Sequence, residues 1–74
     1  MLTEEQVRAA MRAAGISVDI DAIELNDKFR DRGLDSLDVF NLLIELQAET
    51  GREVPDKDVP LLDSTAAILN YFKS

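Results

Sequence analysis

The chain has 74 residues, with 8 basic and 15 acidic side chains and a formal net charge of −7 at pH 7. A chain of this length forms one small domain, to which we assign residues 1–74. It contains no cysteine and no histidine, which excludes disulfides, thiolate metal sites and catalysis that needs an imidazole. The acidic balance argues against nucleic-acid binding, because phosphate backbones bind positively charged surfaces.

No apolar run approaches the roughly 20 residues that a membrane-spanning helix needs, and no signal-peptide pattern opens the chain. We therefore expect a soluble, cytoplasmic protein that makes no membrane contact. We also expect it to be a monomer. Because neither an imidazole nor a thiol is present to act as base or nucleophile, we also expect a protein that is not an enzyme and that binds no metal.

The first predicted element is a helix over about residues 4–14. Thr3 and Gln6 have the spacing of a capping box, in which each side chain satisfies a free backbone N–H group of the first turn. The apolar residues of this segment recur with helical spacing, and Gly15 follows as a helix end. One face of the helix is therefore expected to pack in the core.

Residues 16–34 show no sustained helical period. Some alternation of apolar and polar residues is typical of a strand, but a lone strand has no pairing partner in so short a chain. We therefore predict a long loop that is attached to the core by Ile23, Leu25 and Phe29. A loop of this length without secondary structure is uncommon and is frequently functional.

The second predicted helix covers residues 36–50. Asp35 is a good N-cap residue directly before it, and Gly51 ends it. Pro55 then begins a short helical segment that Pro60 limits to about one turn.

Ser64 caps a last helix over residues 65–72. The predicted fold is thus all-α. It is a small antiparallel bundle of three main helices plus a short third helical segment, with a long loop between the first and second helices.

The helix over residues 36–50 has apolar residues on two faces. At about 100° per residue, one face carries side chains that fit a core, namely Val39, Leu42, Leu43 and Leu46. The opposite face carries Leu37, Phe40 and Ile44, and acidic residues lie between the two faces, namely Asp38, Glu45 and Glu49. Because a helix in so small a bundle is hardly buried all round, we expect the second apolar face to be partly exposed as a docking surface. Packing of Phe40 against the last helix or the loop stays open as an alternative.

Acidic residues concentrate on this helix and on the segment after it. Residues 35–58 contain seven acidic and two basic residues, so −5 of the net charge lies in this stretch. An acidic face is frequently only a solvated surface. Beside an apolar patch, it favours recognition of a basic partner, whose approach it would steer.

Ser36 lies in the first turn of this helix, directly after Asp35. The N-terminus of a helix favours anions through its free N–H groups and its dipole, so a phosphate ester on Ser36 would be well placed. An Asp-Ser pair at a helix start is more commonly only a cap. A hydrolase nucleophile is excluded, since the Gly-x-Ser-x-Gly pattern is absent around Ser36 and no base is available.

The motif around Ser36 resembles the attachment motif of the acyl carrier protein family of phosphopantetheine carriers. The residues that carry this resemblance are Asp35-Ser36-Leu37-Asp38, preceded by Phe29 and Gly33-Leu34. The likeness extends over nearly the whole chain and includes the acidic second helix, the exit over residues 49–55 and the last helix. It implies that Ser36 bears 4′-phosphopantetheine, transferred from coenzyme A by a separate magnesium-dependent phosphopantetheinyl transferase. Asp35 and Leu37 would lie beside the attachment site.

The same resemblance implies a carrier whose arm ends in a thiol that holds an acyl or aminoacyl group as a thioester. It implies a surface that binds basic patches on acyl-loading, acyl-transfer or condensing enzymes, formed by Asp35, Leu37, Asp38, Phe40, Ile44 and Glu45. By analogy with the family, a cargo pocket would lie between the second helix and residues 54–68. Its candidate lining residues, for each of which core packing is the alternative, are Leu46, Val54, Leu62 and Ile68.

The pathway stays open among fatty acid, polyketide and related biosynthesis. One alternative is an aminoacyl or peptidyl carrier, and another is a carrier-like docking module that never bears the arm. A calcium-binding domain is a further class. It is disfavoured because the sequence contains no Asp-x-Asp-x-Asp-Gly loop.

Overall fold

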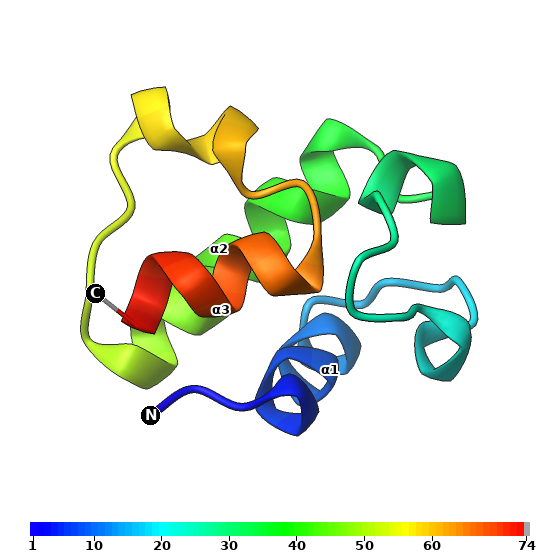
Figure 1. The fold of residues 1–74 in the computed structure, drawn as a ribbon, viewed down its shortest axis with the longest axis horizontal. Coiled ribbons are helices and arrows are strands. Elements are labelled where there is room, and N and C mark those ends of the chain that lie inside the picture. The colour runs from blue at the N-terminus through cyan, green and yellow to red at the C-terminus, as the bar shows by residue number, and fades with distance from the viewer. Residues whose placement is uncertain (74) are drawn as a thin grey trace.

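A computed structural model describes residues 1–73, which form helices joined by loops and contain no strand. The three main helices are α1 (Glu4–Ala13), α2 (Ser36–Thr50) and α3 (Thr65–Lys73). Three short 3₁₀ helices lie in the connections, namely η1 (Ile20–Ala22), η2 (Phe29–Arg32) and η3 (Asp56–Leu61). Helix α1 contacts both α2 and α3 (Figure 1). The predicted all-α class, with three main helices and a short additional segment, is confirmed.

Helix α1 begins at the predicted capping box. The Gln6 backbone N–H donates to Thr3 Oγ1 at 3.2 Å, and the Thr3 N–H donates to Gln6 Oε1 at 2.8 Å. The helix ends at Ala13, one residue before the predicted end.

Among residues 1–73, no helix combines the length and the apolar character that a bilayer crossing requires.

A single apolar core joins the three helices and the long loop between α1 and α2. Its buried members are Val7, Ala10, Met11, Ile16, Ile20, Ile23, Phe29, Leu34, Leu42, Leu43, Leu46, Val54, Leu62, Ile68 and Phe72. Five of them come from the loop, so this segment contributes to the core as a helix would. Burial of apolar surface at about 25 cal/mol per Å² holds the loop in place.

The loop between α1 and α2 is also attached through its backbone. Ile23 and Phe29 are buried as predicted, but the Leu25 side chain is 40% exposed, so its predicted place in the core is wrong. Instead, the Leu25 carbonyl oxygen accepts the Ala66 N–H at 2.9 Å, and the Phe29 N–H donates to the Asp63 carbonyl oxygen at 2.8 Å. These two bonds hold the loop beside the start of α3.

The segment before α3 is longer than predicted. Helix η3 has six residues, which make two 3₁₀ turns at about three residues per turn. The Asp58 N–H donates to the Pro55 carbonyl oxygen at 2.9 Å, and the Leu62 N–H donates to the Val59 carbonyl oxygen at 3.0 Å. Pro60 is the second residue of this latter turn, where its fixed φ fits and no N–H is needed. The prediction of one turn was wrong because Pro60 sits within a turn rather than ending the helix.

Candidate functional site

The chain enters α2 through a tight turn at Gly33. This residue has φ = 91°, and a Cβ atom there would lie 3.2 Å from Val18 Cγ1, so both the backbone conformation and the space favour glycine. The Gly33 N–H donates to the Arg30 carbonyl oxygen, and the Leu34 N–H donates to that of Phe29. Leu34 is buried. The turn therefore fixes the first residues of α2 at the surface.

Helix α2 begins with a reciprocal cap between two aspartates. The Asp38 N–H donates to Asp35 Oδ1 at 2.8 Å, and the Asp35 N–H donates to Asp38 Oδ2 at 3.2 Å. The sequence predicted Asp35 as the N-cap but gave no role in the cap to Asp38. Both carboxylates thus stabilise the helix start in addition to any role toward a partner.

Ser36 is the first residue of α2, and its side chain is exposed. Within residues 1–73, no hydrogen bond engages its hydroxyl, and the backbone N–H groups of Ser36 and Leu37 have no acceptor. Free N–H groups at a helix N-terminus stabilise an anion. An accessible hydroxyl beside such groups fits a phosphate ester of the kind through which phosphopantetheine is attached.

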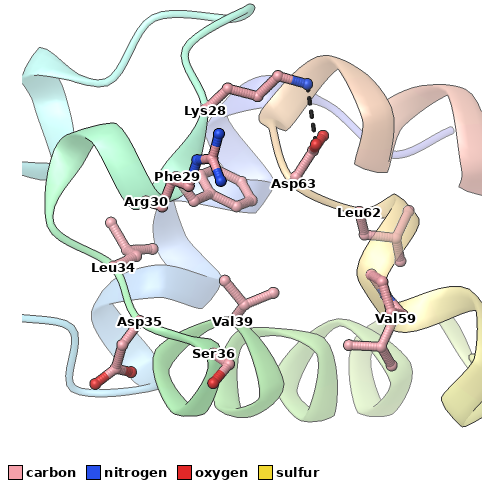
Figure 2. A pocket seen from close by; sticks show the side chains of 11 residues that line it. Lys28, Phe29, Arg30, Leu34, Asp35, Ser36, Val39, Val59, Leu62 and Asp63 are labelled. Carbon is pink, nitrogen blue, oxygen red and sulfur yellow. Dashed lines mark hydrogen bonds and ion pairs between the residues drawn. The ribbon is translucent and has the colours of Figure 1, made fainter.

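A cavity of about 550 Å³ lies beside Ser36 (Figure 2). It is bounded by η2 and the residues around it, by the first turns of α2 and by the end of η3. Its apolar lining residues are Phe29, Leu34, Val39, Val59, Pro60 and Leu62. Its polar lining residues are Lys28, Arg30, Asp35, Ser36 and Asp63. The cavity is thus apolar inside, with charged groups on part of its wall.

The outer face of α2 is apolar and exposed. The exposed fractions of Leu37, Phe40 and Ile44 are 64%, 46% and 46%. The expected exposure of this face is confirmed, and the alternative in which Phe40 packs inside is wrong. Asp35 is exposed, and Asp38 and Glu45 are partly exposed beside the apolar residues. All six residues of the predicted docking surface therefore lie on α2 or at its cap.

The comparison with known proteins agrees with this geometry. Residues 5–72 match the family model described as a phosphopantetheine attachment site. The chain belongs to the phosphopantetheine-bearing acyl carrier proteins. It is 36% identical over 72 residues to the acyl carrier protein of Campylobacter jejuni subsp. doylei, a match that covers 96% of this chain and 92% of that protein. It is 37% identical over 59 residues to the acyl carrier protein of Campylobacter curvus, covering 78% and 77% of the two chains.

Acyl carrier proteins are non-catalytic carriers, so this chain is a carrier and not an enzyme. The group that its family bears is phosphopantetheine. Within residues 1–73 of the carrier, no three acidic side chains are grouped so as to hold a metal ion.

The cavity in the carrier differs from the pocket that the sequence predicted. Of the four candidate lining residues, only Leu62 lines it, whereas Leu46, Val54 and Ile68 are core residues. The cavity also has lining residues that the sequence did not predict for a cargo pocket. They are Lys28, Phe29, Arg30, Leu34, Val39, Val59, Pro60 and Asp63. No local pattern in the sequence signals this set, because residues 28–34 and 59–63 meet only through long-range contacts.

An ion pair joins two sides of the cavity wall. Lys28 Nζ lies 2.9 Å from Asp63 Oδ2 (Figure 2). The hydrogen bond from Lys28 holds the pKa of the Asp63 carboxyl below its ordinary value of 3.8, and the positive charges of Lys28 and Arg30 lower it further. The pair reinforces the nearby backbone bond from Phe29 to Asp63.

This ion pair predicts a pH dependence in acid. Because the pKa of Asp63 is lower in the folded chain, the pair contributes stability above about pH 4, and this contribution is lost as the pH falls through the folded pKa. In Lys28→Met, we expect the pKa of Asp63 to rise toward 3.8, measured by NMR titration of its side-chain carboxyl. Arg32→Met, which removes a cation paired with Asp27, should leave the Asp63 pKa unchanged. Equal Asp63 pKa values in wild type and Lys28→Met would contradict the ion pair.

Proposed function

We propose that this chain is an acyl carrier protein that holds acyl intermediates as thioesters on 4′-phosphopantetheine attached to Ser36. It presents them to enzymes of fatty acid, polyketide or related biosynthesis, as a monomeric cytoplasmic protein whose residues 1–74 form a single carrier domain. The observation that supports this assignment best is the exposed Ser36 hydroxyl, free of hydrogen bonds within residues 1–73, at the N-terminus of α2.

The residues around Ser36 have separate tasks in this proposal. The N–H groups of Ser36 and Leu37 face the phosphate ester and offset its charge. The cap formed by Asp35 and Asp38 holds the first turn of α2 rigid. Ser36 therefore keeps the same position on the surface whichever partner enzyme docks. The bound arm supplies the thiol that the chain itself lacks, since the sequence contains no cysteine.

The outer face of α2 is the proposed docking surface for the transferase and for acyl-loading, acyl-transfer and condensing enzymes. Its exposed apolar side chains give contact area, and Asp35, Asp38 and Glu45 meet a basic patch on the partner. Weak docking of this kind suits a carrier, because the flexible tether already raises the local concentration of the cargo to about the millimolar range. One carrier can then visit several enzymes in turn.

The attachment is tested by incubating the protein with coenzyme A, Mg²⁺ and a phosphopantetheinyl transferase of broad specificity. We expect the intact mass to increase by one phosphopantetheine, and peptide fragmentation to locate the group on Ser36. The experiment is repeated with several transferases, since docking differs between them. If none of them produced an adduct, or if the adduct lay on another residue, the proposal would be wrong.

The docking surface predicts a charge-dependent loading rate. Glu45→Lys should slow loading by the transferase roughly threefold to tenfold at low salt, and less at high salt, because steering by exposed charges is screened. Glu45 suits this test better than Asp38, whose carboxylate also caps α2. Glu24→Lys changes the net charge by the same amount in the loop between α1 and α2. Equal loading rates for the two variants at low ionic strength would contradict a specific role for Glu45.

A further inference from the structure

Arg30 lines the cavity beside Ser36 but, within residues 1–73, makes no hydrogen bond or ion pair through its guanidinium group. The neighbouring cations differ in this respect. Lys28 pairs with Asp63 at 2.9 Å, and Arg32 pairs with Asp27 at 2.8 Å. Arg32 also lies outside the set of residues that line the cavity. Arg30 is therefore a cation at the cavity whose guanidinium N–H groups have no acceptor within residues 1–73, although its charge acts on Asp63 without a hydrogen bond or ion pair.

The two carboxylates of the cavity wall already have partners. Asp35 accepts the Asp38 N–H at 2.8 Å, and Asp63 accepts from Lys28. The remaining lining residues are apolar, apart from Ser36. An anion that entered the cavity would thus meet the guanidinium group of Arg30, which has no ion-pair partner, whereas the Asp35 carboxylate, whose partner is a backbone N–H, lies beside Ser36 on the other side of the cavity (Figure 2).

Arg30 lies toward the Asp63 side of the cavity. Its positive charge acts on Asp63, whose pKa the Lys28 hydrogen bond and the charges of both cations lower. Figure 2 shows Arg30 and Lys28 on one side of the cavity, with Ser36 on α2 at the opposite side and Val39 between them. A group that starts at Ser36 and returns into the cavity would pass apolar side chains before it reached Arg30.

We propose that the cavity binds a tethered acyl group that ends in a carboxylate, and that Arg30 binds this carboxylate. This inference rests on the proposed attachment of the arm to Ser36. The guanidinium group suits the ligand because its fixed fork of N–H donors matches a carboxylate with two parallel hydrogen bonds. The apolar wall formed by Phe29, Val39 and Leu62 contacts the methylene groups between thioester and carboxylate. Arg30 thereby favours dicarboxylic over neutral acyl groups of the same length.

The test compares two cargoes with the same acyl chain, one ending in a free carboxylate and the other in its neutral methyl ester. The protein is loaded by a phosphopantetheinyl transferase from glutaryl-coenzyme A or from its methyl ester, and intact mass measures the loading. Thermal unfolding is then followed at low salt for wild type, Arg30→Gln and Arg32→Gln. The two variants lose the same charge two residues apart, but only Arg30 lines the cavity. The quantity compared is the difference in Tm between the two cargoes within each protein, which cancels general effects of each substitution.

We expect the glutaryl form of wild type to melt about 2–5 °C above its methyl ester. The shift is small because an exposed ion pair favours the cargo inside the cavity over the cargo in solvent only a few-fold, and this preference stabilises the folded state. This difference should disappear in Arg30→Gln, persist in Arg32→Gln and shrink at high salt. Equal Tm differences in wild type and Arg30→Gln would overturn the proposal. So would a Tm effect of Arg30→Gln that appeared equally with the unloaded arm, because Arg30 would then bind the phosphodiester. Failure of loading on Ser36 would instead refute the attachment, and the mass measurement distinguishes that outcome.

Discussion

Ser36→Ala is expected to eliminate the phosphopantetheine adduct completely while leaving the fold intact. The variant removes the one hydroxyl that the proposal uses, and no transferase can form a phosphate ester on alanine. Because the Ser36 side chain is exposed and makes no hydrogen bond within residues 1–73, its removal costs the folded state no hydrogen bond. Alanine is also the better helix former in the first turn. Intact mass after incubation with coenzyme A, Mg²⁺ and the transferase measures the loss, and circular dichroism checks the fold.

Ser64 provides the matched control for this experiment. It is buried before α3, and its Oγ accepts the Ala67 N–H at 3.1 Å. Ser64→Ala should therefore lower the free energy of unfolding by about 0.5–2 kcal/mol through loss of a cap, which is a Tm decrease of about 4–8 °C per kcal/mol. It should load fully. A persistent adduct on Ser36→Ala, or loss of the adduct on folded Ser64→Ala, would contradict the assignment.

Local signals in the sequence predicted the start of each of the three main helices and the two faces of α2, but not the short helices η1 and η2 within the predicted loop. Capping depends on residues three positions apart, so Thr3 with Gln6 could be recognised directly. The reciprocal bond from the Asp35 N–H to Asp38 was missed because the usual partner at that position is the longer Glu or Gln. The exposure of Leu37, Phe40 and Ile44 followed from helical periodicity and from the small size of the bundle.

The cavity was not predictable because its walls meet through contacts that a local pattern does not encode. Phe29 is bonded to Asp63 through its backbone, and Lys28 reaches the Asp63 carboxylate across 35 positions of the chain. Apolar spacing also misplaced Leu25, whose carbonyl oxygen attaches the loop to α3 while its side chain stays partly exposed, at 40%. Hydropathy reports which side chains are suited to burial, but backbone hydrogen bonds position this loop as well.

Leu46→Ala is expected to leave little of the protein folded, because Leu46 belongs to the core and not to the cavity. Leu46 is fully buried in the core and does not line the cavity. Truncation of a buried leucine costs about 2–5 kcal/mol, and a core in a chain of this length supplies only about 3–5 kcal/mol in total. We expect the cooperative urea transition, followed by circular dichroism, to shift to much lower urea or to vanish.

Val39→Ala is the matched truncation at the cavity. Val39 is only partly buried and lines the cavity, so the loss of two methyl groups costs about 1 kcal/mol and the transition stays cooperative. A saturated acyl cargo on Ser36 shows whether a truncated residue lines the cargo pocket or packs in the core. A cargo that fills the space left by a truncation restores stability, and it can do so only where it reaches that space. We expect such a cargo to raise the Tm of Val39→Ala and to leave Leu46→Ala largely unfolded. Recovery of Leu46→Ala by the cargo, with no effect on Val39→Ala, would return Leu46 to the cargo pocket and contradict its assignment to the core.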